Sequence, residues 1–452
     1  MKNLLFSVLA LAGICFGQTK EDSIQFRKIS DEILLHGQAY DLLYNLTQNI
    51  GHRLSGSPEY EKATLWAEQQ LKGAGADKVW LQETLVPVWH RGKESLKYKT
   101  GNGEWKDINF LSLGNSEGTG KKDVEGEVIR VTNFDEFNKL PAETVKGKIV
   151  FFDYHFPQQY VETFRGYGEA YIYRSHTASA VAEKGGKFAI IRSVSTGPDD
   201  VPHTGTMNYD EKFAKIPAVA VGNTTADMLA GLIKNQKLYL KLNSDCGMQP
   251  EKINHSVVGE IKGKDDKIIT VGGHLDSWDV GEGAHDDGAG IVQTIEILRT
   301  FKKLGIQPNH TIRFVCFANE ENGARGGVKY AEEAKSKNET HLFALESDAG
   351  GFSPRGISLD MDDSKIKQIQ SWLPLFEPYG AYLLIKGYGG VDINPLKYTM
   401  GVPVAGLVPD SQRYFDIHHS AADTFDKVNK RELHLGAIVM AQMIYMIDKY
   451  WK

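Results

Sequence analysis

Histidine and acidic residues gather at a few points in the second half of the chain. Each group stands beside an apolar run or in the glycine-rich stretch VGGHLDSWDVGEGAHDDGAG. The candidates for metal chemistry are His274, Asp276, Asp286, Asp287, Glu320, Glu321, Asp348, His418 and His419. Imidazole and carboxylate together are ligands typical of zinc, whereas a set of oxygens alone would suit calcium or magnesium. The residue types therefore predict zinc.

The number of candidates indicates more than one ion. One catalytic zinc takes about three protein ligands, whereas a pair of zinc ions roughly 3.5 to 4 Å apart needs about five, with one carboxylate bridging. A single acid at a strand end is usually a cap or a solvated residue, but coincidence does not explain the whole set. In the doublet Glu320-Glu321 the two side chains leave the backbone in different directions, so one can bind metal while the other faces a water.

The elements that must position these residues follow from the apolar spacing beyond Ser256. The runs KIITVGGHLD, TIRFVCFANEEN and HLFALESDAGG are typical of buried strands, and GAGIVQTIEILRTFKKLG is typical of an amphipathic helix. This order predicts a β-α-β unit in a mostly parallel sheet, where ligands gather at the carboxyl ends of the strands. We expect four strand ends to carry the acidic groups, and RELHLGAIVMAQMIYMIDKYW to form a helix that packs on the sheet.

The first half of the chain has a different texture. Between about residues 23 and 75 the spacing predicts two helices, the second with Ser57 as N-cap, Pro58 at its first position and Gly73 at its end. From about residue 100 to residue 245 short β-rich runs such as GKIVFFDY, FAIIRSV and IPAVAVG predict an inserted β-rich domain. The expected boundaries are 1–17 for a signal peptide, 18–100 for the N-terminal part of the catalytic domain, 101–250 for the insert and 251–452 for the rest of the catalytic domain.

Composition limits the class of protein. The chain has 452 residues, a net charge of −6, 24% charged and 41% hydrophobic residues, which is not the basic excess of a nucleic-acid-binding protein. Lys2, the apolar run 4–16 and Gly17 follow the plan of a secretory signal, so we expect export to the periplasm or the extracellular space. No later run is long enough to span a membrane. Cleavage after Gly17 would leave only Cys246 and Cys316, so no disulfide framework is expected.

Five motifs together resemble one family. They are GHRLSGSPEYEKATLWA, GGHLDSWDVGEGAHDDGAG, FANEENGARGG, ESDAGG and HHSAADT. The chain resembles the co-catalytic di-zinc exopeptidases related to bacterial leucyl aminopeptidases, and the resemblance covers nearly all of the chain after residue 17. It implies an α/β fold with a mostly parallel central sheet, helices on both faces and an inserted β-rich, protease-associated-like domain that caps the cleft.

The resemblance also implies roles for individual residues. It implies two zinc ions per chain, with Asp286 bridging them, held by His274, Asp286, Glu321, Asp348 and His419. His419 is preferred to His418 because the ligand of the family stands four residues before an acidic residue, here Asp423. Glu320 matches the general base and Asp276 the acid behind His274, which agrees with the need of a ligating histidine for an acceptor at its other nitrogen. The family has a cis bond that would fall between Asp286 and Asp287.

The function implied is hydrolysis of dipeptides or short peptides with free termini, by a water bridging the zinc ions and activated by Glu320. The segment KGYGGVDINPLKYTMGVPVAGL resembles the lining of the substrate pocket, so Tyr388, Gly389, Gly390 and Asp392 are expected to contact substrate; an ordinary glycine-rich turn is the alternative. Relatives suggest a homodimer. Two other functions stay open: a glutaminyl-cyclase-like acyl transferase with one zinc, and a non-catalytic receptor-like ectodomain.

Overall fold

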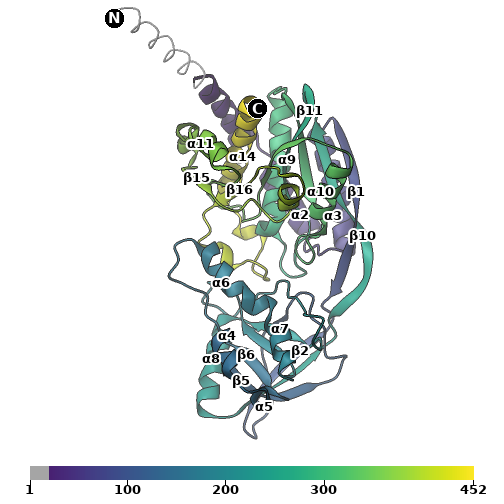
Figure 1. The fold of residues 1–452 in the computed structure, drawn as a ribbon, viewed down its shortest axis with the longest axis vertical. Helices are drawn as coiled ribbons and strands as arrows, with labels where there is room; N and C mark the ends of the chain where they lie inside the picture. The colour runs from purple at the N-terminus through teal and green to yellow at the C-terminus, as the bar shows by residue number, and fades with distance from the viewer. Residues whose placement is uncertain (1–19, 452) are drawn as a thin grey trace, which may run out of the picture.

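The protein folds around two eight-stranded sheets (Figure 1). The structure is a computed structural model that describes residues 20–451, so the predicted signal peptide lies outside the described residues. The first sheet has the spatial order β1 (Lys78–His90), β10 (Gly247–Ile261), β12 (His310–Phe317), β11 (Asp265–His274), β13 (His341–Glu346), β16 (Val404–Pro409), β14 (Pro354–Asp360) and β15 (Leu383–Lys386).

The middle of this sheet is parallel, and the strands on either side join it antiparallel. Strands β12, β11, β13 and β16 run parallel, whereas β1 pairs antiparallel with β10, β10 with β12, and β14 with β16. The predicted α/β fold is confirmed, and the sheet is more mixed than the expected mostly parallel arrangement. The parallel strands carry the predicted runs KIITVGGHLD, TIRFVCFANEEN and HLFALESDAGG, and their carboxyl ends meet at one edge.

Helices cover both faces of the first sheet. They are the helical residues 20–36 and α2 (Ala39–Asn49), α3 (Pro58–Gly73), α9 (Ala289–Lys303), α10 (Arg325–Ser336), α11 (Asp363–Gln370), α12 (Leu373–Phe376), α13 (Asn394–Met400) and α14 (Lys430–Tyr450). Alternation along β12 assigns the faces, because Phe314 belongs to the core under α9 and α14 whereas Val315 belongs to the core under α10 and α13.

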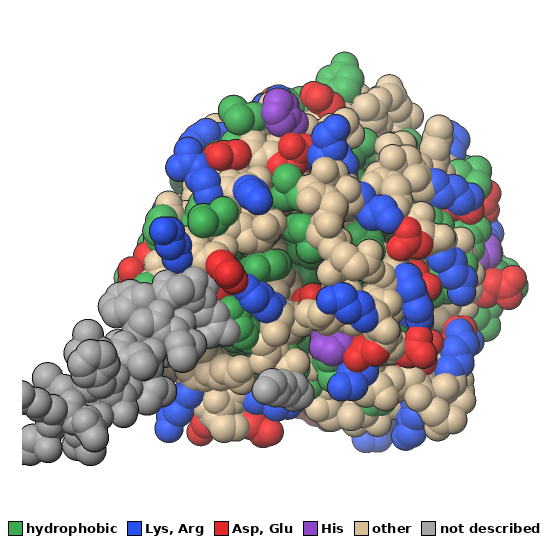
Figure 2. All heavy atoms as spheres, turned by 90° about the horizontal axis from the view of Figure 1, so that it is seen from above, with side chains coloured by type: hydrophobic (Ala, Val, Ile, Leu, Met, Phe, Trp, Pro, Cys, Tyr) green, Lys and Arg blue, Asp and Glu red, His purple; other side chains and the backbone are tan. Residues whose placement is uncertain are grey.

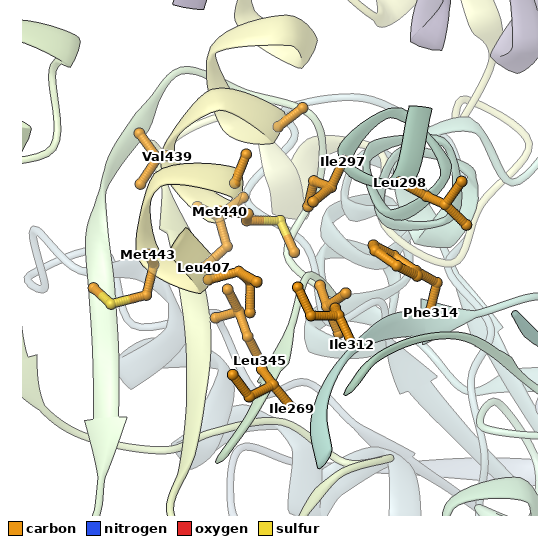
Figure 3. Packing of buried hydrophobic residues seen from close by; sticks show 14 of the residues in the cluster. Ile269, Ile297, Leu298, Ile312, Phe314, Leu345, Leu407, Val439, Met440 and Met443 are labelled. Carbon is orange, nitrogen blue, oxygen red and sulfur yellow. The ribbon is translucent and has the colours of Figure 1, made fainter. Parts of the chain in front are cut away.

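The larger core lies between the sheet and the helices α9 and α14. Figure 3 shows Ile269, Ile312 and Leu345 of the strands beneath Leu298 of α9 and Met440 of α14. Burial of such apolar side chains is the main stabilising contribution to the fold. The prediction that the C-terminal amphipathic helix packs on the sheet is confirmed.

The N-terminal helical region contains three helices where two were expected. The helix of residues 20–36 ends before Gly37, where an added Cβ would lie only 2.3 Å from the carbonyl oxygen of Ile33. The backbone N–H of Gln38 then donates to Glu296 Oε2 at 2.8 Å, which fixes the start of α2. The apolar spacing continues across this break, so periodicity did not reveal it. Helix α3 begins as predicted, with Ser57 Oγ accepting from the backbone N–H of Tyr60 at 3.1 Å.

The second sheet lies below the first in Figure 1 and takes its strands from residues 94–244. Their order is β3 (Lys106–Asp107), β2 (Glu94–Thr100), β9 (Leu238–Ser244), β5 (Val124–Val131), β6 (Ile149–Phe152), β7 (Ala189–Arg192), β8 (Ala218–Val221) and β4 (Leu111–Ser112). The three apolar runs named above form β6, β7 and β8. The region is less purely β than expected, because it also contains α4 (Phe134–Lys139), α5 (Ala142–Val145), α6 (Thr163–Ser175), α7 (Thr177–Glu183) and α8 (Asn223–Asn235).

The surface and the cysteines agree with the composition. On the face in Figure 2, Lys and Arg side chains are interspersed with Asp and Glu, as the modest net charge of −6 suggests. Within residues 20–451 no helix combines the length and the apolar character needed to cross a membrane. Cys246 and Cys316 are both buried and unpaired.

Candidate metal centre

Three neighbouring strands bring most of the predicted ligands to one edge of the first sheet. His274 is the last residue of β11, Glu320 and Glu321 come shortly after the end of β12, and Asp348 comes shortly after the end of β13. The expectation of a fourth strand end is wrong for Asp286 and Asp287. They lie in the short turn Ala284–Gly288 that leads into α9, because the chain folds back over the strand ends before the helix begins.

Asp286 stands between the two histidines. Its Oδ1 lies 3.2 Å from His274 Nε2, and its Oδ2 lies 3.2 Å from His419 Nε2. Asp348 Oδ1 lies 3.4 Å from the first histidine nitrogen, and Glu321 Oε2 lies 3.2 Å from the second. The five predicted ligands thus form two groups that share one carboxylate, which is the arrangement of a bridging ligand between two ions. The bond between Asp286 and Asp287 is cis, as the resemblance implied.

The donor atoms of this cluster suit a cation. His274 Nε2, Asp286 Oδ2 and Glu321 Oε1 are buried and make no hydrogen bond within the described part of the chain. Buried polar atoms without partners are costly, and a metal ion would satisfy all three. Three groups of histidine and acidic residues each have their donor atoms within 4.8 Å of one another, and together they contain the five predicted ligands and also His418 and Asp287.

Crowding of the acids perturbs their titration. Burial raises the pKa of Glu320 to about 8, and the carboxylates of Asp348 and Asp286 add to the rise although His274 opposes it. Burial likewise raises the pKa of Glu321 well above its usual range. Burial would lower the pKa of His274, but the neighbouring Asp348 and Asp286 hold it well above the usual value. Such shifts are expected where several acids share a site built for cations.

His418 lies beside the predicted ligand His419, and the two rings stack with centroids 3.5 Å apart. The Nε2 atom of His418 is 3.7 Å from Asp286 Oδ2, farther than the 3.2 Å of His419 Nε2. His418 Nδ1 is buried without a hydrogen bond. The distances therefore favour His419 as the ligand, in agreement with the choice made from the motif.

Asp276 supports the site differently from the expected contact. His274 Nδ1 faces the backbone oxygen of Asp276 at 3.0 Å, whereas the carboxylate Oδ1 is 3.8 Å away. The carboxylate instead accepts the backbone N–H groups of Glu320 at 3.0 Å and Glu321 at 3.3 Å, and it also accepts from Ser55 Oγ. One residue therefore orients the histidine through its backbone and the glutamate pair through its side chain.

Other buried groups that the motifs did not single out hold the turn with the bridging carboxylate. Asp423 accepts the backbone N–H groups of His285 at 2.8 Å and Asp286 at 3.0 Å. Arg53 is fully buried and donates to the backbone oxygens of Leu275, Glu282 and Gly283. Arg53 stands in the quoted motif GHRL, and Asp423 served only as a landmark for His419. An arginine or an acid that binds backbone leaves no spacing signature, so the sequence pointed to neither role.

A cavity of about 1050 Å³ opens beside the cluster and is lined by Glu320, Glu321, Asp286 and Asp348 among others. Three of the four residues predicted to contact substrate, Tyr388, Gly389 and Gly390, line it. Asp392 does not; it is fully buried, with both carboxylate oxygens lacking partners. Its backbone N–H donates to Glu346, which itself lines the cavity. The glycines are needed there, since a Cβ on Gly390 would lie 2.3 Å from the Glu346 carboxyl carbon.

Residues 201–210 of the second sheet region contact backbone groups of the site. His203 Nδ1 lies 2.5 Å from the backbone oxygen of His418, and the backbone N–H of Thr204 donates to the backbone oxygen of His419 at 2.8 Å. Thr206 Oγ1 donates to the backbone oxygen of Glu321 at 2.5 Å. The second sheet region therefore helps to hold the strand-end residues in place.

Comparison with known proteins agrees with this geometry. Residues 256–444 match peptidase family M28. Carboxypeptidase Q of Homo sapiens is 32% identical over 442 residues, which are 96% of this chain and 91% of that protein. Carboxypeptidase Q of Bos taurus is 31% identical with the same coverage.

Solved structures share the fold. The crystal structure of a peptidase M28 precursor from Shewanella amazonensis has a TM-score of 0.90 at 32% identity, covering 95% of this chain and 97% of that one. A zinc aminopeptidase from Bacillus subtilis has a TM-score of 0.65 at 20% identity, covering 92% and 96% of the two chains, which shows the same fold.

Proposed function

The chain belongs to peptidase family M28 and is a metal-dependent exopeptidase, and from this premise we propose that it hydrolyses dipeptides or short peptides with two zinc ions. The observation that carries the proposal is the position of Asp286, whose two oxygens each face a different histidine at 3.2 Å. One ion would be held by His274, Asp348 and Asp286. The other would be held by His419, Glu321 and the shared Asp286.

When bound, the two ions would lower the pKa of a water molecule and polarise the scissile carbonyl. Glu320 takes a proton from the attacking water and gives it to the leaving amine. Its side chain is 17% exposed toward the cavity, whereas that of Glu321 is 1% exposed, so the two neighbours divide the roles of base and ligand. Asp276 keeps both residues in position through their backbone N–H groups.

Residues 101–250 act as a cap that restricts the cleft to short substrates. Helix α6 brings Phe164 and Tyr167 against Tyr414 and Phe415 on the opposite wall, with ring centroids 4.8 to 5.6 Å apart. A folded protein could not enter a cavity bounded in this way. Tyr388, Gly389 and Gly390 line the cavity and would contact the substrate. Asp392 lies behind this lining and would act indirectly, because its backbone N–H donates to Glu346.

The test is the zinc content of the purified chain, measured together with hydrolysis of a small dipeptide panel before and after chelation. We expect two zinc ions per chain and cleavage that is lost on chelation and recovered on adding zinc. A single zinc with full activity would remove the bridging role of Asp286. Activity that survives complete metal removal would contradict the mechanism.

Export and self-association belong to the same proposal. Residues 1–17 have the composition of a secretory signal, and a homodimer stays an expectation. The N-terminal sequence of the mature protein from the periplasm or medium, and its mass in solution, test these two points.

A further inference from the structure

One arginine in the cleft has no partner of opposite charge. Arg174, near the end of α6, is 6% exposed and lines the cavity. Its Nη2 donates to the hydroxyl of Tyr167 at 2.8 Å, and its Nη1 lies 3.4 Å from His419 Nδ1. Its Nε makes no hydrogen bond, and no carboxylate of residues 20–451 forms an ion pair with it. Burying a guanidinium without an anion costs free energy, so we expect Arg174 to bind an anionic ligand.

The other cations of the cavity are satisfied by the protein. Arg355 pairs with Asp410 at 2.6 Å, and Lys386 pairs with Asp363 at 2.8 Å. Both are also more exposed than Arg174, with side chains 37% and 68% accessible. Among the described residues that line the cavity, Arg174 is thus the unpaired cation, and it lies at the deep end beside the metal cluster.

When His419 binds a metal, both nitrogens in the contact between Arg174 and His419 are hydrogen-bond donors. Nε2 of His419 faces Asp286 and Glu321, so Nδ1 must carry the proton of the neutral ring. Two donors, Nη1 of Arg174 and Nδ1 of His419, then face each other. Gly205 keeps the space beside them open, because an added Cβ would lie 2.6 Å from both the guanidinium carbon and that nitrogen. An oxygen acceptor is what this pair of donors can bind together.

We propose that Arg174 binds the free α-carboxylate of the residue that follows the scissile bond. Only the ring of His419 separates the guanidinium from the metal-binding carboxylates, because Nη1 lies 3.4 Å from Nδ1 while Nε2, on the other side of the ring, lies 3.2 Å from Asp286 Oδ2 and Glu321 Oε2. A carboxylate at Arg174 therefore belongs to the residue next to the bond that is cut. The inference rests on the proposed function and makes it more specific: the enzyme recognises the carboxyl end, so it acts on dipeptides and on the last residue of short peptides.

The first test varies the substrate and leaves the protein intact. The zinc-loaded full chain is given leucyl-alanine and leucyl-alanine amide, which differ only in the terminal carboxylate. Because a charge-assisted pair with a buried guanidinium is lost in the amide, kcat/KM should fall by about 10-fold to 100-fold. Equal rates for the acid and the amide would overturn the role of Arg174 while leaving peptide hydrolysis established.

The second test varies the arginine. R174Q should lose the preference for the acid, so that the two substrates differ by less than about threefold, with most of the change in KM. R174K, which keeps the charge but not the fork of donors, should be intermediate. R165Q is the matched control, since Arg165 is an exposed arginine on the same helix that stacks over Tyr160. An R174Q variant that keeps the preference for the acid would refute the proposal.

A binding measurement separates this inference from the proposed function. If the wild-type chain with zinc hydrolyses neither probe, the proposed function fails, and calorimetric binding of the same two probes then decides the role of Arg174. Tighter binding of the acid than of the amide, lost in R174Q, supports it. Equal binding of acid and amide overturns it.

Discussion

The replacement of Glu320 by Gln tests the division of roles within the glutamate pair. The change removes the charge and the ability to accept a proton but keeps the shape of the side chain. The carboxylate of Glu320 lies 4.0 Å from His274 Nε2 and is the more exposed of the pair, 17% against 1% for Glu321. The backbone N–H of Glu320, which holds the turn through Asp276 at 3.0 Å, is untouched. We therefore expect zinc content and thermal stability to stay close to those of the wild type.

The expected loss of activity follows from the role of a general base. Proton transfer by a positioned side chain contributes about 10²-fold to 10⁴-fold to the rate. Each tenfold corresponds to about 1.4 kcal/mol of activation free energy, so E320Q should raise the barrier by about 3 to 5 kcal/mol. The loss should appear in kcat and leave KM nearly unchanged, because Glu320 acts on the water and not on the substrate.

The assay is steady-state hydrolysis of a dipeptide by proteins whose zinc content has been measured, with E321Q as the matched control. Glu321 lies 3.2 Å from His419 Nε2, so its replacement should lower zinc content as well as activity. The reasoning is refuted if E320Q turns over at the normal rate. It is also refuted if E320Q loses zinc as E321Q does, because Glu320 would then be a ligand.

Two further predictions concern the same site. H419A should lose one zinc ion per chain, whereas H418A should keep both. The reason is that His419 Nε2 lies 3.2 Å from Asp286 Oδ2, whereas His418 Nε2 lies 3.7 Å from it. Elemental analysis of the two variants tests this, and equal loss of zinc would contradict the ligand assignment. In the metal-free protein Glu320 has a pKa of about 8, above its usual value of about 4.3. Between these two pH values the folded state binds more protons than the unfolded state. The free energy of unfolding therefore falls as pH rises through this range. Melting temperatures of the metal-free chain from pH 5 to pH 9 should therefore decline more steeply than those of metal-free E320Q, and identical slopes would show that Glu320 does not carry the shift.

Much of the candidate site could be predicted because its residues are placed by local structure. His274, Glu321 and Asp348 follow three strands that are neighbours in the sheet, and parallel strands bring their carboxyl ends to one edge. The zinc preference followed from residue types alone. The position of Asp286 was wrongly predicted to be a strand end. A glycine-rich turn and the loop at the end of a strand have the same composition, so composition alone does not distinguish them.

The fold was predicted where periodicity is unbroken and less well where a single residue changes the path of the chain. Gly37 stands at the break between two helices, where an added Cβ would lie 2.3 Å from the carbonyl oxygen of Ile33, and the spacing of apolar residues does not contain this close approach. Arg53 and Asp423 bind backbone groups far along the chain, and such contacts depend on the finished fold. Arg174 is separated from His419 by 245 residues, so nothing in the segment GYGEAYIYRSH could have placed it at the site.

The region proposed as a cap also contacts the backbone of the candidate metal ligands, and this affects how specificity can be changed. Thr204 and Thr206 hydrogen-bond to the backbone of His419 and Glu321, which are assigned here as metal ligands. Shortening the cap would therefore disturb the metal centre together with the walls of the cavity. Arg174 faces the ring of His419, and among the described residues it makes no hydrogen bond to the backbone of His419 or Glu321. A substitution of Arg174 should therefore change substrate preference with less effect on metal binding than a change in the cap segment that supports the ligands. Attempts to alter specificity should begin with the side chain of Arg174.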